Sequence, residues 1–235
     1  MTVLALFLAM VGSADFVRYG AKDSDLGRRR LAIAVAAVVA FLGFWGLGRP
    51  AHDVWLPAVG LAIVALWAFA DRIPWRSGDR VAFGGVVATV FALLAFGQHL
   101  EVSDGWLQSW YSGLVIDNLA DVPFDRFALA VGCLFILQNT ANLIVRLVLN
   151  GAGPGVMASA KTLKGGRILG PLERTFIFAM ALSGQFAAIG AVIAAKGILR
   201  FPEISRADDD GNIAEYVLVG SFVSWVLALL FIPLF

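Results

Sequence analysis

The chain is dominated by six long stretches that contain no Asp, Glu, Lys or Arg, each 17 to 21 residues long. A helix needs about 20 apolar residues to cross the hydrocarbon core of a bilayer. The pattern therefore predicts an all-α protein, a polytopic bundle of transmembrane helices that forms a single domain over residues 1–235. The predicted spans cover residues 31–48, 54–70, 81–98, 127–149, 174–196 and 215–234.

A shorter apolar run, residues 1–14, precedes Asp15. It predicts a short or tilted seventh helix over residues 2–17, because no basic residue precedes it as in a secretory signal. The alternative is a cleaved signal with Gly12-Ser13-Ala14 as its small-residue cleavage site.

Composition excludes several classes of protein. Charged residues make up 15% of the chain, whereas a soluble domain has about 25%. A net charge of +1 argues against a nucleic-acid partner, and the single cysteine, Cys133, excludes an intrachain disulfide. The common catalytic and metal-binding motifs are absent, so we expect no catalytic residue, no metal and no cofactor, and a non-enzymatic role is favoured.

The basic residues predict an orientation. With seven crossings and the N-terminus outside, thirteen of the eighteen Lys and Arg residues lie on the inner side. The positive-inside rule then places the C-terminus in the cytoplasm. In the longest outer loop, Trp106, Leu107, Trp110 and Tyr111 recur at helical spacing and predict an interfacial helix over residues 105–116. The alternative for this segment is a lid over an outward-facing cavity.

Polar residues inside the predicted spans indicate a candidate functional site. An intramembrane polar group is energetically costly unless it is paired with another group or hydrated. Two stripes are expected on facing helices, with Gln138 and Gln185 meeting near the midplane. Charge pairs are expected at the rims, Arg146 with Glu173 and either Lys196 or Arg200 with Glu215. The stripes either line a pathway or only hold helices together. Their residues are Gln138, Asn139, Asn142 and Arg146 on one helix and Arg174, Gln185 and Lys196 on the other.

Two further features point to partners. A small residue at every fourth position along the predicted span 174–196 predicts close helix packing, and the partner is either another membrane protein or a second copy of this chain in a homo-oligomer. In the preceding loop, the bases Lys161, Lys164 and Arg167 lie among glycines, so they either contact an anionic headgroup or form a plain loop. The residues of the small-residue ridge are Ala179, Ser183, Ala187, Ala191 and Ala195.

Blocks in the C-terminal third resemble a family of bacterial inner-membrane proteins, a domain of unknown function sometimes found beside SatD-type proteins. The resemblance lies in the residues of the ranges 166–174, 184–185, 195–203 and 215–224. It implies a bacterial inner membrane and a polytopic topology, and no particular activity.

Three functions remain open from the sequence. The first is a small transporter or channel-like carrier that uses the two polar stripes. The second is a membrane scaffold or accessory subunit that binds another membrane protein through the small-residue ridge and the Trp-rich outer loop. The third is a lipid-handling membrane enzyme that holds a phosphate headgroup on Arg146 and the loop bases Lys161, Lys164 and Arg167.

Overall fold

The computed structural model describes residues 1–18, 26–48, 51–69, 78–97, 105–116, 121–152, 166–205 and 212–235. These residues form helices and turns and no strand, which confirms the all-α class. Within the predicted single domain, contacts group the chain into two compact units, Met1–Ile136 and Leu137–Phe235.

The helices of the first unit are α1 (Thr2–Arg18), α2 (Leu26–Gly46), η1 (Ala51–Val54), α3 (Trp55–Ala68), α4 (Gly78–Phe96), α5 (Trp106–Ser112) and α6 (Phe124–Phe135). A π-helical turn, η5 (Ile136–Thr140), follows α6. The second unit continues with α7 (Ala141–Ala152), α9 (Gly166–Leu182), α10 (Phe186–Ser205), α11 (Asn212–Leu230) and η6 (Ile232–Leu234).

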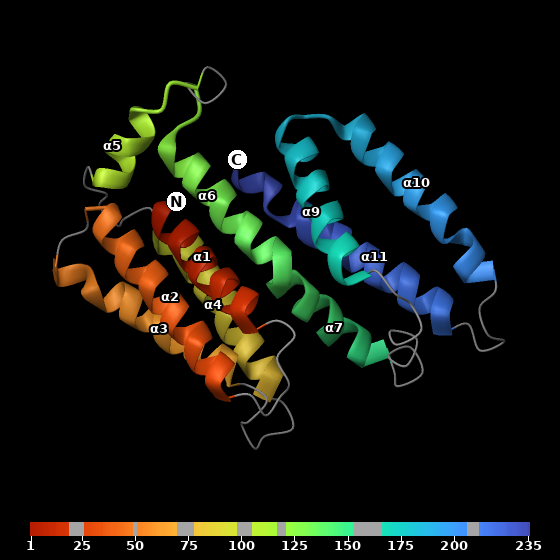
Figure 1. Ribbon diagram of the computed structural model, residues 1–235, viewed down its shortest axis with the longest axis horizontal. Coiled ribbons are helices and arrows are strands. Elements are labelled where there is room, and N and C mark those ends of the chain that lie inside the picture. Colours follow the sequence, from red (N-terminus) through yellow and green to blue (C-terminus); the bar gives the residue numbers. More distant parts are fainter. Residues whose placement is uncertain are drawn as a thin grey trace. The chain divides into compact units, whose positions relative to one another are not determined.

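In the first unit, α1 lies between α2 and α6 (Figure 1). Eleven of its residues are buried, so it is a core helix of this unit. Glycines permit its close approach to α6. A Cβ on Gly12 would lie 2.5 Å from the carbonyl carbon of Phe135, and a Cβ on Gly132 would lie 2.6 Å from the carbonyl oxygen of Ala5. The two backbones are therefore nearly in contact where these helices cross.

The predicted interfacial segment contains a short helix, α5, in the first unit. The Tyr111 hydroxyl donates a hydrogen bond to the carbonyl of Val122, and its ring packs against Phe124 and Phe127. Trp106 and Trp110 are exposed. Tyr111 thus anchors the helix towards α6, and Leu107 lies close to Gly46 of α2, while about half of each indole surface is exposed.

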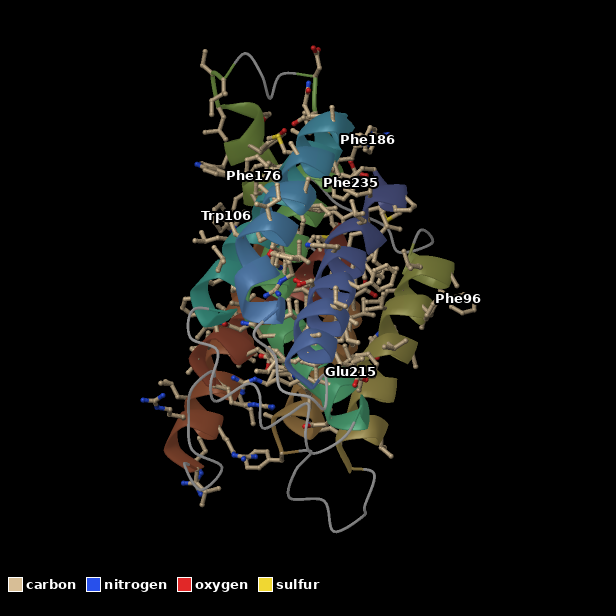
Figure 2. The ribbon with its side chains drawn as sticks, turned by 90° about the vertical axis from the view of Figure 1, so that its right-hand side faces the viewer. Phe96, Trp106, Phe176, Phe186, Glu215 and Phe235 are labelled. Carbon is tan, nitrogen blue, oxygen red and sulfur yellow. The ribbon has the colours of Figure 1, made fainter. Side chains whose placement is uncertain are left out.

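In the second unit, α9 and α10 run in opposite directions and are joined by a tight turn (Figure 1). Ile177 and Ala181 of α9, Ile189 of α10 and Ala228 of α11 form a buried apolar cluster. Figure 2 shows Phe186, at the start of α10, at the same end as Phe235, whereas Glu215 of α11 lies at the opposite end. Helices α10 and α11 are therefore antiparallel as well.

The prediction of one continuous span over residues 174–196 is wrong. Gly184 has a φ of +70°, in the left-handed region that glycine adopts at helix ends. The N–H of Gln185 donates to the carbonyl of Met180, and the N–H of Gly184 donates to that of Ala181. These are the two hydrogen bonds of a Schellman motif, which ends α9 and lets the chain reverse into α10.

Among the described residues, three helices have the length and composition to cross a membrane, fewer than the six firm spans we expected. They are Leu26–Gly46, Phe124–Gly151 and Ile213–Leu234. The second of these joins α6, η5 and α7. Three shorter apolar helices accompany them, Trp55–Ala68, Val81–Phe96 and Phe186–Leu199.

Helix α2 buries small side chains and exposes large apolar ones, which is the reverse of a water-soluble helix. Its buried face carries the alanines Ala32, Ala36 and Ala40. Its exposed face carries large apolar side chains, and a water-soluble helix would place polar groups there. The exposed members of this face are Leu31, Val38, Phe41, Leu42 and Trp45.

Candidate functional site

The described part of the second unit is organised around Arg174 of α9, whose side chain is only 2% exposed. Its Nε donates to the carbonyl oxygen of Leu137 at 2.7 Å, and one terminal nitrogen donates to that of Gln138 at 2.8 Å. Both carbonyls belong to η5. A π turn departs from the regular α-helical ladder of backbone hydrogen bonds, so its carbonyl oxygens are available to an outside donor. The guanidinium of Arg174 therefore supports this irregular turn.

The same guanidinium reaches two further helices. It donates to Oδ1 of Asn142 on α7 at 2.8 Å and to Oγ of Ser224 on α11 at 3.1 Å. These four acceptors are uncharged oxygens held by three elements, and the planar donor fork of arginine suits such a set. Arg174 thereby ties α9 to η5, α7 and α11.

Glu173, the neighbouring residue on α9, points to a different pair of helices. Its Oε2 lies 2.5 Å from Nζ of Lys196 on α10, and its Oε1 accepts a 2.7 Å hydrogen bond from the indole N–H of Trp225 on α11. The Lys196 ammonium also lies over the Trp225 ring, 5.4 Å from its centroid. The three groups form a compact ionic and aromatic cluster, which we call the Glu173 cluster.

Thr175 completes this segment of α9. Its Oγ1 accepts a 2.9 Å hydrogen bond from Nε2 of Gln138. Arg174 and Thr175 therefore both contact Gln138 of η5, whereas Glu173 contacts α10 and α11. These three residues make α9 the polar centre of the second unit.

The structure brings some of the predicted stripe residues together and separates others. Gln138, Asn142 and Arg174 meet in one hydrogen-bonded network, and Asn139 is buried nearby in η5. Gln185 does not join them. It lies exposed in the turn between α9 and α10, so the expected meeting of Gln138 with Gln185 is wrong. Arg174, Gln185 and Lys196 are spaced by eleven residues, which places their side chains on one face only if the helix is unbroken.

The expected rim pairs are also replaced. Glu173 binds Lys196 and Trp225 instead of Arg146, which is exposed on α7. Lys196 therefore binds Glu173 instead of Glu215, which is exposed near the start of α11. The side chain of Arg200 lies outside the described residues. The reversal at Gly184 accounts for these changes, because it carries Lys196 back along α9.

The small-residue ridge is divided by the same turn. Ala179 and Ser183 lie before it, and Ala187, Ala191 and Ala195 lie after it, so they do not form one continuous face. All five residues are exposed in the structure. The proposed headgroup contacts Lys161 and Lys164, and the side chain of Arg167, lie outside the described residues.

The first unit contains a polar cluster that our sequence analysis missed. The indole N–H of Trp67 lies 3.0 Å from each carboxylate oxygen of Asp15, which is 1% exposed. Arg18 donates to the carbonyl of Trp67 at 2.8 Å and lies over its ring at 5.6 Å. Arg29, also buried, donates to the carbonyl of Ala68 at 2.9 Å. The arginines thereby occupy carbonyls at the C-terminal end of α3, a favourable position for a cation.

The two clusters share one arrangement. In each, an indole donates to a carboxylate while a cation lies over the same ring, and in each the acid precedes the tryptophan by 52 residues. The signal that would have revealed the first cluster is Asp15 itself, an acid near the end of an apolar run.

Among the residues that the structure describes, no group of three or more His, Cys, Asp and Glu side chains is placed to hold a metal ion. Comparisons with known protein families, curated proteins and solved structures found no match for this chain. The resemblance of the C-terminal blocks therefore stays a prediction, and the function has to be argued from the two units themselves.

Proposed function

We propose that this chain is an integral protein of a bacterial inner membrane. The support is the inverted distribution of side chains on α2 and α11, where small or polar groups are buried and large apolar groups are exposed. On α11, for example, Ser224 is buried whereas Leu218 and Phe222 are exposed. Extended apolar surface of this kind is typical of a face that contacts lipid.

The reversal at Gly184 changes the topology that we propose. If α9 and α10 each cross, the chain makes eight crossings, by α1, α2, α3, α4, the α6–α7 helix, α9, α10 and α11. Both termini are then outside. Arg200 and Arg206 move to the inner side, whereas Arg174 and Lys196 lie within the crossings of α9 and α10. Of the sixteen other basic residues, fourteen satisfy the positive-inside rule, against twelve with seven crossings. The shorter helices cross through local thinning of the bilayer and snorkelling of their flanking side chains.

Within this membrane protein, the second unit serves as a small carrier, and the polar network of α9 lies along the transported solute's route. The observation that carries this proposal is the Glu173 cluster, a carboxylate shared by an ammonium and an indole on three different helices. Ionisable groups at membrane depth are rare and typically mark ion or substrate pathways. The π turn beside it is a second feature that occurs frequently at functional sites.

The scaffold and lipid-handling alternatives have less support. The scaffold proposal depended on the small-residue ridge, which Gly184 divides between α9 and α10, and on the Trp-rich outer loop, whose Trp106 and Trp110 are exposed. The lipid-handling proposal depended on Arg146, which is exposed on α7, and on Lys161, Lys164 and Arg167, whose side chains the structure does not describe.

Cysteine accessibility on α11 tests the carrier proposal. In a Cys133→Ala background, Ser224→Cys places a thiol in the polar network, and Phe222→Cys places one on the face proposed to contact lipid. The two positions are on one helix, with side chains 5% and 65% exposed in the structure, so they are a matched pair. The variants are reconstituted in sealed vesicles and treated with a charged, membrane-impermeant thiol reagent.

For a carrier in a membrane, we expect the buried position to react and the exposed position to be protected. Lipid excludes the charged reagent from Phe222→Cys, whereas water in the route admits it to Ser224→Cys. Protection of both thiols from both sides of the membrane would contradict the route. Rapid reaction at Phe222→Cys would contradict the lipid-facing surface.

A further inference from the structure

The Glu173 cluster holds a cation in the manner of a ligand site. Nζ of Lys196 contacts the carboxylate at 2.5 Å and lies 5.4 Å from the centroid of the indole ring. The indole N–H meanwhile donates to the other carboxylate oxygen at 2.7 Å, which fixes the ring relative to the acid. The acid and the aromatic face therefore form a cradle whose occupant is the ammonium of this chain's own lysine.

This pair of groups is chemically selective. A carboxylate attracts any cation, but the face of an indole favours weakly hydrated organic cations through its ring quadrupole. A primary ammonium also supplies three N–H donors, of which one satisfies the carboxylate oxygen. The cradle is thus suited to an alkylammonium group more than to a strongly hydrated metal ion.

We propose that the solute of this carrier is an organic cation with a primary ammonium group, and that Lys196 occupies the cradle when no solute is bound. This inference rests on the proposed carrier function. Lys196 is suited to exchange, because its side chain is 19% exposed whereas that of Glu173 is 7% exposed. The incoming ammonium replaces one positive charge with another, so the buried carboxylate is never left without a cation.

The first unit provides an independent example of the same chemistry. There the guanidinium of Arg18 lies over the Trp67 ring while the indole N–H contacts Asp15. In the Glu173 cluster the cation is an ammonium that contacts both the carboxylate and the ring. What recurs in both units is an organic cation over the ring of an indole whose N–H donates to a carboxylate.

Binding of labelled n-butylammonium, which matches the end of a lysine side chain, tests the proposal on the full chain in phosphatidylcholine nanodiscs. The wild type is compared with Lys196→Ala, which vacates the cradle, and with Lys196→Met, which keeps most of the side-chain volume. Glu173→Gln removes the carboxylate from the cradle, and Glu215→Gln, an exposed acid on α11, is its matched control. The uncharged probe n-butanol shows whether binding needs the charge.

We expect saturable binding to the wild type that is unchanged in Glu215→Gln and lost in Glu173→Gln. Lys196→Ala should bind at least about tenfold more tightly than the wild type, because the probe no longer competes with a tethered ammonium, and about tenfold corresponds to roughly 1.4 kcal/mol. Lys196→Met should bind more weakly than Lys196→Ala, because its side chain fills the cradle. Equal binding to the wild type and Glu173→Gln, or no binding to the wild type, would overturn the proposal.

Two further measurements distinguish a lipid headgroup from a free amine, and a wrong solute class from a wrong carrier function. Nanodiscs that contain phosphatidylethanolamine distinguish a lipid ammonium headgroup, which would compete with the probe, from a free amine, which leaves the affinity unchanged. Both outcomes retain the ammonium class. The cysteine experiment on α11 is the control for the carrier itself. A reactive Ser224→Cys with no ammonium binding would overturn the solute class alone, and a protected Ser224→Cys would overturn the carrier function.

Discussion

Glu173 and Lys196 are separated by 23 positions in the chain, yet their carboxylate and ammonium groups lie 2.5 Å apart. On one unbroken helix the two residues would be about 35 Å apart, at 1.5 Å per residue. The contact exists because the chain reverses between Ser183 and Phe186. The geometry of one glycine in that turn therefore determines which charges meet in the second unit.

Gly184→Ala should destabilise the chain by about 1–2 kcal/mol, the cost of a left-handed conformation for a residue with a Cβ. Thermal unfolding of the detergent-solubilised protein measures this loss. Gly190→Ala on α10 is the matched control, because a Cβ there meets no atom within 4 Å. The control variant should be stabilised by up to about 1 kcal/mol, because alanine has a higher helix propensity than glycine. Equal effects at the two positions would contradict the Schellman turn.

Gly12→Ala should lower stability by about 1–3 kcal/mol through overpacking between α1 and α6. The obstacle is backbone, with the carbonyl carbon of Phe135 at 2.5 Å from the new Cβ, so no side-chain rotation relieves it. Gly84→Ala on α4 provides the comparison, since a Cβ there meets nothing within 4 Å. If unfolding temperatures fall equally in both variants, the close crossing of the two helices is wrong.

Arg174→Lys should lower the free energy of unfolding by about 2 kcal/mol or more. The lysine ammonium lacks the forked N–H donors of the guanidinium, so buried oxygens of η5 lose their hydrogen bonds. The charge is retained, so the loss reports the geometry of the guanidinium. Arg30→Lys, at an exposed position on α2, should change stability by less than about 0.5 kcal/mol. Denaturant titration in mixed micelles measures both, and a tolerated Arg174→Lys would argue against support of the π turn.

Glu173→Gln and Trp225→Phe should be coupled when combined. Each variant disturbs the same 2.7 Å hydrogen bond, so the double variant should lose less stability than the sum of the single losses. A coupling energy of about 1–2 kcal/mol is expected for a buried charge-assisted pair. Additive effects in this double-mutant cycle would show that the indole and the carboxylate act independently.

A reporter fused after Phe235 should be on the outer side of the membrane. Eight crossings with the N-terminus outside return the C-terminus to the outside, whereas seven leave it in the cytoplasm. An alkaline phosphatase fusion, active only outside, and a fluorescent protein fusion, bright only inside, give opposite signals. A second pair inserted in the range 206–211 should report the inner side, and the same side for both sites would contradict a crossing by α11.

The helical class was predictable because uncharged runs of span length leave few alternatives in a chain with 15% charged residues. Part of one predicted polar stripe also lies together in the structure, whereas its last member, Arg146, is exposed on α7. Gln138 and Asn142 share one helical region, and both belong to the Arg174 network.

The pairs between helices were less predictable. Their assignment assumed that an apolar run is one helix, and Gly184 lies inside such a run without a charge or proline to mark the break. Hydropathy does not encode the φ of a glycine, so Gln185 and Lys196 were assigned to the wrong neighbours. The pair of Asp15 with Trp67 depends on contacts between three helices, which no spacing within one helix predicts.

The π turn Ile136–Thr140 has a consequence for how this protein tolerates changes of length. A π turn accommodates one residue more than an α turn, so it absorbs an extra residue without rotating the helix that follows. Deleting one residue here would regularise the backbone and withdraw the carbonyls of Leu137 and Gln138 from the guanidinium of Arg174, while Asn142 keeps its orientation. A further inserted residue that the turn does not absorb would rotate Asn142 by about 100° about the helix axis. Sequence drift in this segment is therefore expected to proceed by substitution while its number of residues stays fixed.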